Sequence, residues 1–254
     1  MARVDLNSDL GESFGRYSLG LDDQVIPLVT SVNIACGMHA GDPCVMRRTV
    51  AAAAAAGTSI GAHPGYPDLQ AFGRRDIALS PDEAYAFVLY QISALAGFCK
   101  AEGTALAHVK PHGQLYNRAA KDAALAEAIA AAVHDFDPTL VLVGLAGGKL
   151  IEAGRAANLA TAQEFFADRN YMADGTLVPR KQENAVIANE DFAVARVVRA
   201  VQEGTIEAVD GSTIEVAADT ICIHGDNAHA LEFAKKIRTA LTQAGVELKP
   251  CRAQ

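Results

Sequence analysis

The chain lacks several features that would assign it to a specialised class of protein. Its 254 residues contain no tryptophan, and aromatic residues make up only 6% of them. No apolar run reaches the roughly 20 residues that a membrane-spanning helix needs, and no apolar signal segment follows Met1. The five cysteines form no C-x-x-C pair, so neither a disulfide framework nor a thiolate zinc site is indicated. We therefore expect a cytoplasmic protein with reduced thiols that contacts no membrane.

Basic residues are also in short supply. Lys and Arg together number 22 against 30 Asp and Glu, which gives a formal net charge of −8. A nucleic-acid-binding protein needs a basic face to meet phosphates, so we expect no nucleic-acid partner. Half of the residues are hydrophobic, which is more than a disordered chain contains.

Two familiar catalytic motifs are missing. The segment from Gly144 to Lys149 looks like a phosphate-binding loop, but a Walker motif needs Gly at position 143 and Ser or Thr at position 150, where Val143 and Leu150 stand. Glycines at a helix start could still bind an anion through their free N–H groups. The chain also has no G-x-S-x-G elbow, so no covalent nucleophile is indicated.

Short apolar segments alternate with longer helical patterns along the whole chain. The expected strands are Val4–Asp9, Ser31–Ala35, Ser59–His63, Ala107–Lys110, Leu140–Gly144, Leu159–Glu164 and Thr220–His224. The expected helices are Pro43–Ala56, Pro81–Ala101, Lys121–Val133, Lys149–Ala156, Asp191–Glu203 and Ala228–Ala244. This order is typical of parallel strands joined by helical crossovers. The turn Asp210-Gly211 predicts a small hairpin over Thr205–Val216.

Most of the expected strands carry polar residues on one face and apolar residues on the other. The polar faces hold Asp5, Asn7 and Asp9, then Ser31 and Asn33, Ser59, Gly61 and His63, His108 and Lys110, and Cys222 and His224. Helices must cover the apolar faces, so the polar faces point at one another. Only Leu140–Val143 reads as the continuous apolar run of an open, doubly covered sheet. The sequence therefore predicts an α/β fold, a single β/α barrel domain over residues 1–254.

Acidic, basic and imidazole side chains gather at the carboxyl ends of these strands, where barrel enzymes keep their active sites. They are Asp9, Glu12, His39, Asp42, His63, Lys110, His112, Glu164, Asp168, Arg169, His224 and Asp226. Three of the nearby charges have simpler interpretations: Asp42 as a helix cap, and the Arg74-Arg75 pair as solvated surface. A metal site is possible with Asp9, His39 and His63 as candidate ligands, but no spacing rule requires one.

Six ordered motifs resemble the LamB/YcsF family over nearly the whole chain. They run from Asp5 to Glu12, from Asn33 to Asp42, from Gly61 to Pro67 with Phe72-Gly73-Arg74-Arg75, from Val109 to Asn117, from Glu164 to Gly175, and from Ile223 to Asp226. The resemblance implies a seven-stranded barrel of the glycoside hydrolase/deacetylase type. It also implies opening of the 5-oxoproline (pyroglutamate) lactam to L-glutamate with ATP and Mg²⁺, together with two partner subunits, B and C.

We expect the polar lumen to hold both acid/base and substrate-binding groups. The expected catalytic residues are Asp9, Lys110, His112, Asp168 and His224. The expected substrate-binding residues are Asn7, Glu12, Asn33, His39, Asp42, His63, Arg74, Arg75, Tyr116, Glu164, Arg169 and Asp226. Two alternatives stay open: a metal-dependent deacetylase or amide hydrolase acting alone, and a substrate-binding subunit without chemistry of its own.

Overall fold

Seven parallel strands close into a barrel in the computed structural model, which describes residues 2–179, 181–223 and 228–251. The barrel strands are β1 (Arg3–Leu10), β2 (Ser31–Ala35), β3 (Ser59–His63), β4 (Leu106–Val109), β5 (Val141–Leu145), β6 (Ala160–Phe166) and β9 (Thr220–Cys222). They follow one another in that order, and β9 pairs with β1 to close the ring. The expected seven-stranded barrel is therefore confirmed. A short strand that was not expected, β10 (Glu247–Leu248), extends the sheet beside the start of β1.

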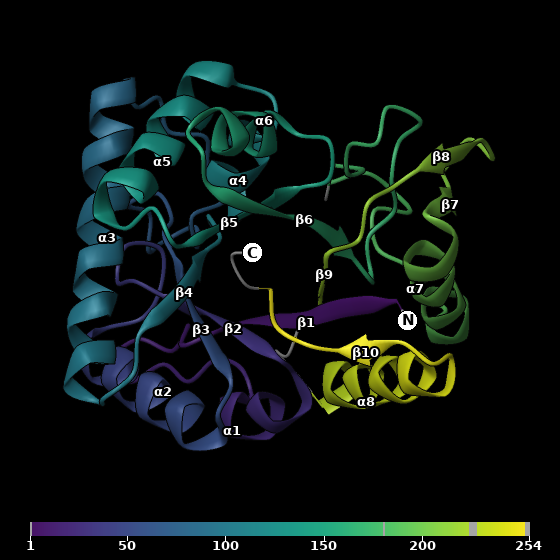
Figure 1. The fold of residues 1–254 in the computed structure, drawn as a ribbon, viewed down its shortest axis with the longest axis horizontal. Helices are drawn as coiled ribbons and strands as arrows, with labels where there is room; N and C mark the ends of the chain where they lie inside the picture. Colours follow the sequence, from purple (N-terminus) through teal and green to yellow (C-terminus); the bar gives the residue numbers. More distant parts are fainter. Residues whose placement is uncertain (1, 180, 224–227, 252–254) are drawn as a thin grey trace.

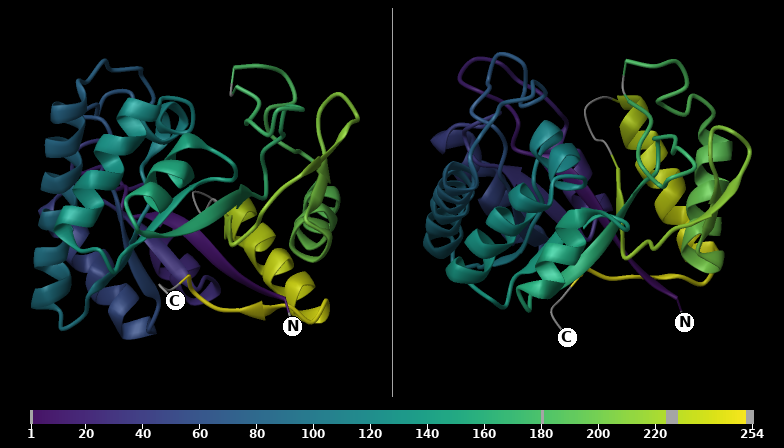
Figure 2. Two further views of the ribbon diagram at one scale, coloured as in Figure 1. Left: turned by 45° about the horizontal axis from the view of Figure 1, so that its top comes forward. Right: turned by 90° about the horizontal axis from the view of Figure 1, so that it is seen from above.

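Helices surround the barrel (Figure 1). The long ones are α2 (Pro43–Ala56), α3 (Pro81–Ala101), α5 (Ala123–Phe136), α6 (Lys149–Ala156), α7 (Glu190–Glu203) and α8 (Ala228–Gln243). Shorter ones are α1 (Asp22–Val25), the 3₁₀ helix η1 (Ile26–Leu28) and α4 (Gly113–Ala119). The expected hairpin is present as β7 (Thr205–Glu207) and β8 (Thr213–Glu215), antiparallel and separate from the barrel. It lies with α7 and α8 on the side away from α3 (Figure 2).

Strand register determines which side chains enter the lumen. Asn7 lies beside Ser31 and Asp9 beside Asn33 on the first strand pair. The pairing continues around the barrel through Gly61, His108, Val141, Ala160, Glu164, Thr220 and Cys222, with one register shift between Ile60 and Gly61 where β3 meets β4. Because side chains alternate between the two faces, one set of partners lies inside all the way round. The polar faces expected from the sequence therefore meet within the barrel.

The part of the lumen beside β5 and β6 is apolar. Val141, Val143 and Ala162 form a small buried cluster of their own, and Cys251 near the carboxyl terminus packs against it. Leu142 on the opposite face joins the main core between barrel and helices. This two-sided burial explains why β5 alone reads as a continuous apolar run.

Helix α3 has the length and apolar composition of a membrane span. Its buried residues Ala84, Val88, Ile92 and Leu95 belong to the main core, while Tyr90 on another face is exposed. A helix that covers a barrel presents one such apolar stripe to the core.

Candidate functional site

A buried lysine lies at the centre of the polar lumen. The Nζ of Lys110, at the end of β4, lies 2.7 Å from Oε1 of Glu164 and 3.0 Å from Oδ1 of Asp9. It also donates to Oδ1 of Asn7 at 3.2 Å and contacts Sγ of Cys222 at 3.3 Å. The lysine and Glu164 are buried, whereas Asp9 is partly accessible. We call Asp9, Lys110 and Glu164 the charged triad.

Within the triad, the charges of Asp9 and Lys110 hold each other ionised. Burial opposes the charge on Lys110, but Asp9, Cys222 and Glu164 outweigh burial and raise the pKa of the lysine well above its ordinary value. Burial likewise opposes the charge on Asp9, but His63 and Lys110 outweigh it and hold the pKa of Asp9 well below 3.8. At neutral pH the site therefore keeps an anionic carboxylate next to a cationic amine.

Two asparagines extend this network across the barrel. Asn7 donates to Oε1 of Glu164 at 3.0 Å and to Oγ1 of Thr220 at 2.7 Å. Asn33 donates to Oδ1 of Asn7 at 2.7 Å and to Oδ1 of Asp9 at 2.9 Å. The Oδ1 of Asn33 accepts from Nε2 of His108 at 2.7 Å. This chain of hydrogen bonds satisfies buried polar groups that would otherwise be costly.

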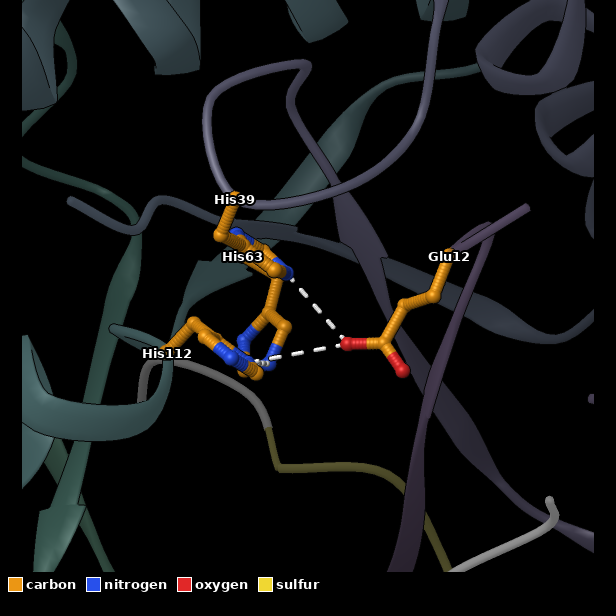
Figure 3. A group of neighbouring side chains, drawn as sticks. All are labelled: Glu12, His39, His63 and His112. Atoms are coloured by element: carbon orange, nitrogen blue, oxygen red, sulfur yellow. Dashed lines mark hydrogen bonds and ion pairs between the residues drawn. The ribbon is translucent and has the colours of Figure 1, made fainter. Parts of the chain in front are cut away.

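Beside the triad lies a second group of side chains: Glu12, His39, His63 and His112. Figure 3 shows these four side chains. We call it the histidine group. One ligand atom from each of its four side chains lies within 4.8 Å of the other three. The Oε1 of Glu12 is 3.3 Å from Nε2 of His39 and 3.6 Å from Nδ1 of His112. The Nε2 of His63 connects the two groups, because it lies 3.3 Å from Oδ2 of Asp9.

The loops that follow the strands hold the three imidazole rings in place. His63 ends β3, and its Nδ1 donates to the carbonyl of Lys110 at 2.7 Å. His112 precedes α4, and its Nε2 donates to the carbonyl of Phe72 at 2.9 Å. The ring of His39 stacks on that of His112 with centroids 3.6 Å apart. The geometry of the rings is therefore fixed before any ligand arrives.

Two of these imidazoles are neutral at physiological pH. Burial, with neighbouring His63, lowers the pKa of His39 well below 6.5. Burial and then His39 and His63 lower the pKa of His112 in the same direction. Neutral imidazoles offer lone pairs to a metal ion or accept a proton from a substrate.

Other expected residues lie near the site without belonging to either group. Tyr116 is buried, with its ring 5.8 Å from that of Phe166, and the neighbouring Glu164 adds to burial in raising its pKa. Asp168 is half-buried in the loop after β6. Arg74 is exposed with its guanidinium 5.2 Å from the ring centre of Phe72, which itself contacts His39 and His112. Arg74 thus lies at the rim above the histidine group.

Three expected substrate-binding residues have architectural contacts. Asp42 caps α2 and accepts from the backbone N–H groups of Cys44, Val45 and Gly15. Arg75 pairs with the buried carboxylate of Asp68. Arg169 donates to the carbonyls of Ala185 and Val178, which ties together the loop between β6 and α7. Within the part of the chain that the structure describes, these contacts assign architectural roles to Asp42 and Arg75 and a loop-ordering role to Arg169.

Two expected residues, His224 and Asp226, lie outside the described residues. One contributor that the sequence did not predict is Phe72, whose carbonyl orients His112. The backbone φ of Phe72 is 57°, which is unusual for a bulky residue. The next residue, Gly73, also has a positive φ, of 64°. Backbone conformation of this kind gives no pattern in a single sequence.

The comparisons with known proteins agree with the motifs. The LamB/YcsF family model matches residues 4–254. A protein of Tolumonas auensis, named as the A subunit of 5-oxoprolinase, is 60% identical over 249 residues, covering 98% of this chain and 99% of that protein. A protein of the same name from Geobacillus kaustophilus is 58% identical over 254 residues, covering 100% of this chain and 99% of that protein. The crystal structure of a lactam utilization protein from Thermus thermophilus superposes with a TM-score of 0.92 at 50% identity, covering 97% of this chain and 99% of that one.

Proposed function

Because this chain belongs to the LamB/YcsF family, we propose that it is the lactam-binding and ring-opening subunit of an ATP-dependent 5-oxoprolinase. In this function it acts with two partner subunits, B and C, on 5-oxoproline, and the product is L-glutamate. The names of its relatives, which describe the A subunit of 5-oxoprolinase and a lactam utilization protein, support a role on a lactam.

One observation carries the proposal: the ionised Asp9 lies beside the histidine group, whose His39 and His112 are neutral, at a partly accessible position above the buried Lys110. The side chain of Asp9 is 18% exposed and that of Glu12 is 15% exposed, while the imidazoles and the lysine beneath them are buried. A small cyclic amide needs an acceptor for its N–H and a base for the attacking water. Both kinds of group are present within contact distance of each other.

The chemistry divides between nucleotide and protein. A lactam is a weak electrophile, and transfer of the γ-phosphoryl group of ATP to its carbonyl oxygen makes the carbonyl carbon more electrophilic. Asp9 accepts a hydrogen bond from the ring N–H, since Lys110 keeps this carboxylate ionised. A neutral imidazole of the histidine group takes a proton from water as the water adds to the carbonyl carbon. The C–N bond of the tetrahedral intermediate then breaks as the imidazolium returns the proton to the ring nitrogen, which leaves the acyl phosphate of the opened chain. A second water hydrolyses this acyl phosphate to L-glutamate and phosphate. Arg74 at the rim binds the substrate carboxylate or phosphate charge.

The direct test measures glutamate release from 5-oxoproline. The chain is assayed alone and with its two partner subunits, each with and without ATP and Mg²⁺. We expect glutamate only from the complete mixture with ATP. The absence of glutamate from that mixture would overturn the proposal. Glutamate from the chain alone without ATP would replace it with a stand-alone amide hydrolase.

A variant then separates chemistry from binding alone. Asp9→Asn keeps the size of the side chain and removes its charge, so we expect kcat of the complete mixture to fall at least 100-fold with 5-oxoproline binding still measurable. Asp76→Asn, at an exposed position, is the matched control and leaves kcat unchanged. If Asp9→Asn retains full activity, the ring-opening role passes to one of the partners.

A further inference from the structure

The hydrogen bonds of His63 and His112 determine which ring nitrogen of each residue carries a proton. A carbonyl oxygen only accepts hydrogen bonds, so Nδ1 of His63 must carry the proton that it donates to Lys110. For the same reason Nε2 of His112 carries the proton that it donates to Phe72. The remaining nitrogens, Nε2 of His63 and Nδ1 of His112, then face each other at 3.0 Å.

Two neutral rings with these tautomers place two lone pairs against each other. Three contacts need a proton, namely the two to carbonyls and the one between the rings, and two neutral imidazoles supply only two. A positive charge between the rings resolves this repulsion. The charge is either an extra proton or a metal cation that accepts both lone pairs.

The other two members of the group decide between these possibilities. Nε2 of His39 and Oε1 of Glu12 lie 3.3 Å apart, and Oε1 lies 3.6 Å from Nδ1 of His112. A tetrahedral zinc ion with bonds of 2.0–2.2 Å has its ligand atoms about 3.4 Å from one another. Three pairs of these donor atoms lie 3.0, 3.3 and 3.6 Å apart, and all four lie within 4.8 Å of one another. An extra proton bridges only two atoms, whereas four donor atoms converge here.

From this geometry we propose that Glu12, His39, His63 and His112 bind one divalent zinc-like cation. The donors are Nε2 of His39, Nε2 of His63, Nδ1 of His112 and a carboxylate oxygen of Glu12. Imidazole nitrogens with one carboxylate favour zinc and its first-row neighbours over Mg²⁺ or Ca²⁺, which prefer oxygen ligands. The proposal goes beyond the lactam-opening function, and its test does not depend on that function. In the metal-loaded chain the lone pairs of the imidazoles would be occupied, so activation of water would pass from a free imidazole to the cation.

The surroundings of the group match those of a metal site. The carbonyls of Lys110 and Phe72 bind the outer N–H groups of His63 and His112, and ligand imidazoles are usually oriented in this way by backbone or carboxylate acceptors. Gly65 and Gly73 leave room for the rings, because a Cβ at Gly65 would lie 2.5 Å from Nδ1 of His39 and one at Gly73 would lie 2.9 Å from His112. Glu12 is partly accessible, which gives a cation a path from solvent.

Metal binding to this chain alone tests the proposal. The full chain is stripped with a chelator, dialysed and titrated with Zn²⁺ by calorimetry and by competition with a chromophoric chelator. We expect each chain to bind one equivalent of Zn²⁺ with high affinity. When Co²⁺ replaces Zn²⁺, we expect the visible absorption of a four-coordinate site. Neither lactam nor nucleotide is present, so the result stands whether or not the lactam activity is found.

Variants show whether the cation binds at the proposed residues. Glu12→Gln is expected to weaken Zn²⁺ binding at least tenfold with unchanged circular dichroism, whereas Glu152→Gln at an exposed position leaves it unchanged. His134→Ala removes an exposed histidine and controls for adventitious binding. The proposal is overturned if the wild-type chain binds no high-affinity equivalent, if Glu12→Gln binds as the wild type does, or if His134→Ala abolishes binding. The extra proton would then be the charge between the rings.

Discussion

At the residue scale, the hydrogen-bond network of the lumen needs a glycine at position 61 as well as polar side chains. His108 crosses the barrel to reach Asn33, and it passes through the space that a side chain at position 61 would fill. A Cβ at Gly61 would lie 2.1 Å from Nε2 of His108. Glycine at this strand position therefore permits the hydrogen-bond chain from His108 to Asn33, Asn7 and Glu164.

The variant Gly61→Ala is expected to lower the free energy of unfolding by about 1–3 kcal/mol, because overpacking forces neighbouring groups to shift. Urea denaturation followed by circular dichroism measures the change. Gly97→Ala on α3 is the control, since a Cβ there meets nothing within 4 Å. It should stabilise the helix by about 0.5–1 kcal/mol. Equal stability of Gly61→Ala and wild type would show that His108 can move at no cost.

Lys110→Met leaves Asp9 and Glu164 without their buried cation. Removing one partner from a buried ion pair costs about 3–5 kcal/mol, so we expect a loss of this size at pH 7. The low pKa of Asp9 stabilises the folded state above its ordinary value of 3.8, and this contribution disappears as pH falls through the folded-state pKa. The stability gap between variant and wild type should therefore narrow below about pH 4. A gap that widens on acidification would contradict this account of the triad.

Residue chemistry at the site was partly predictable. The rule that reactive groups follow barrel strands placed Asp9, His63 and Lys110 at strand ends, and the structure brings them together. The rule could not distinguish Glu12, which meets the histidines, from Arg169, which binds loop carbonyls. That difference depends on loop conformation, which a strand pattern does not encode.

At the element scale, capping residues followed by proline predicted the first residues of two helices correctly. The expected and observed limits coincide for α2 and α3, because Pro43 and Pro81 occupy the first helical position after the capping residues Asp42 and Ser80. The predicted start of α5 was two residues early, since Asp122 rather than Lys121 provides its cap. Helix α4 was not predicted, because Pro111-His112-Gly113 has the composition of a loop. The two-residue strand β10 is too short to give a period.

The cap of α2 makes a prediction for acid stability. Backbone N–H groups of Val45, Gly15 and Cys44 donate to Asp42 and lower its pKa. Asp42→Ala should cost about 1 kcal/mol at pH 7, measured as a shift in the urea midpoint. A carboxylate with a lowered pKa stabilises the folded state above its ordinary value of 3.8 and less below it. The cost should therefore shrink toward pH 3, whereas a cost independent of pH would indicate that the charge plays no part.

At the scale of the whole molecule, the barrel is closed by β9, which joins distant parts of the chain; we call its pairings with β1 and β6 the seam. β9 pairs with β1 on one edge and with β6 on the other, over three residues at most on each. The closed lumen, and so the meeting of the triad with the histidine group, depends on this seam. The polar strand faces made closure predictable, but they did not indicate that β9 would be so short.

Closure of the barrel also gives a test of the expectation that the chain forms a single domain. Since the first strand contacts both β9 and β10, the chain should unfold in a single cooperative transition. Scanning calorimetry is expected to give a calorimetric enthalpy that agrees with the van't Hoff enthalpy. Two resolved transitions would instead divide the chain into separately folding parts.

The pairing of one edge of β1 with strands from the end of the barrel sequence has a consequence during synthesis. β1 leaves the ribosome first, while residues 220–222 and 247–248, which cover its second edge, leave near the end. An uncovered strand edge invites pairing with other chains. A nascent chain thus carries an exposed edge until β9 and β10 have emerged, and the native lumen cannot form before β9 is available.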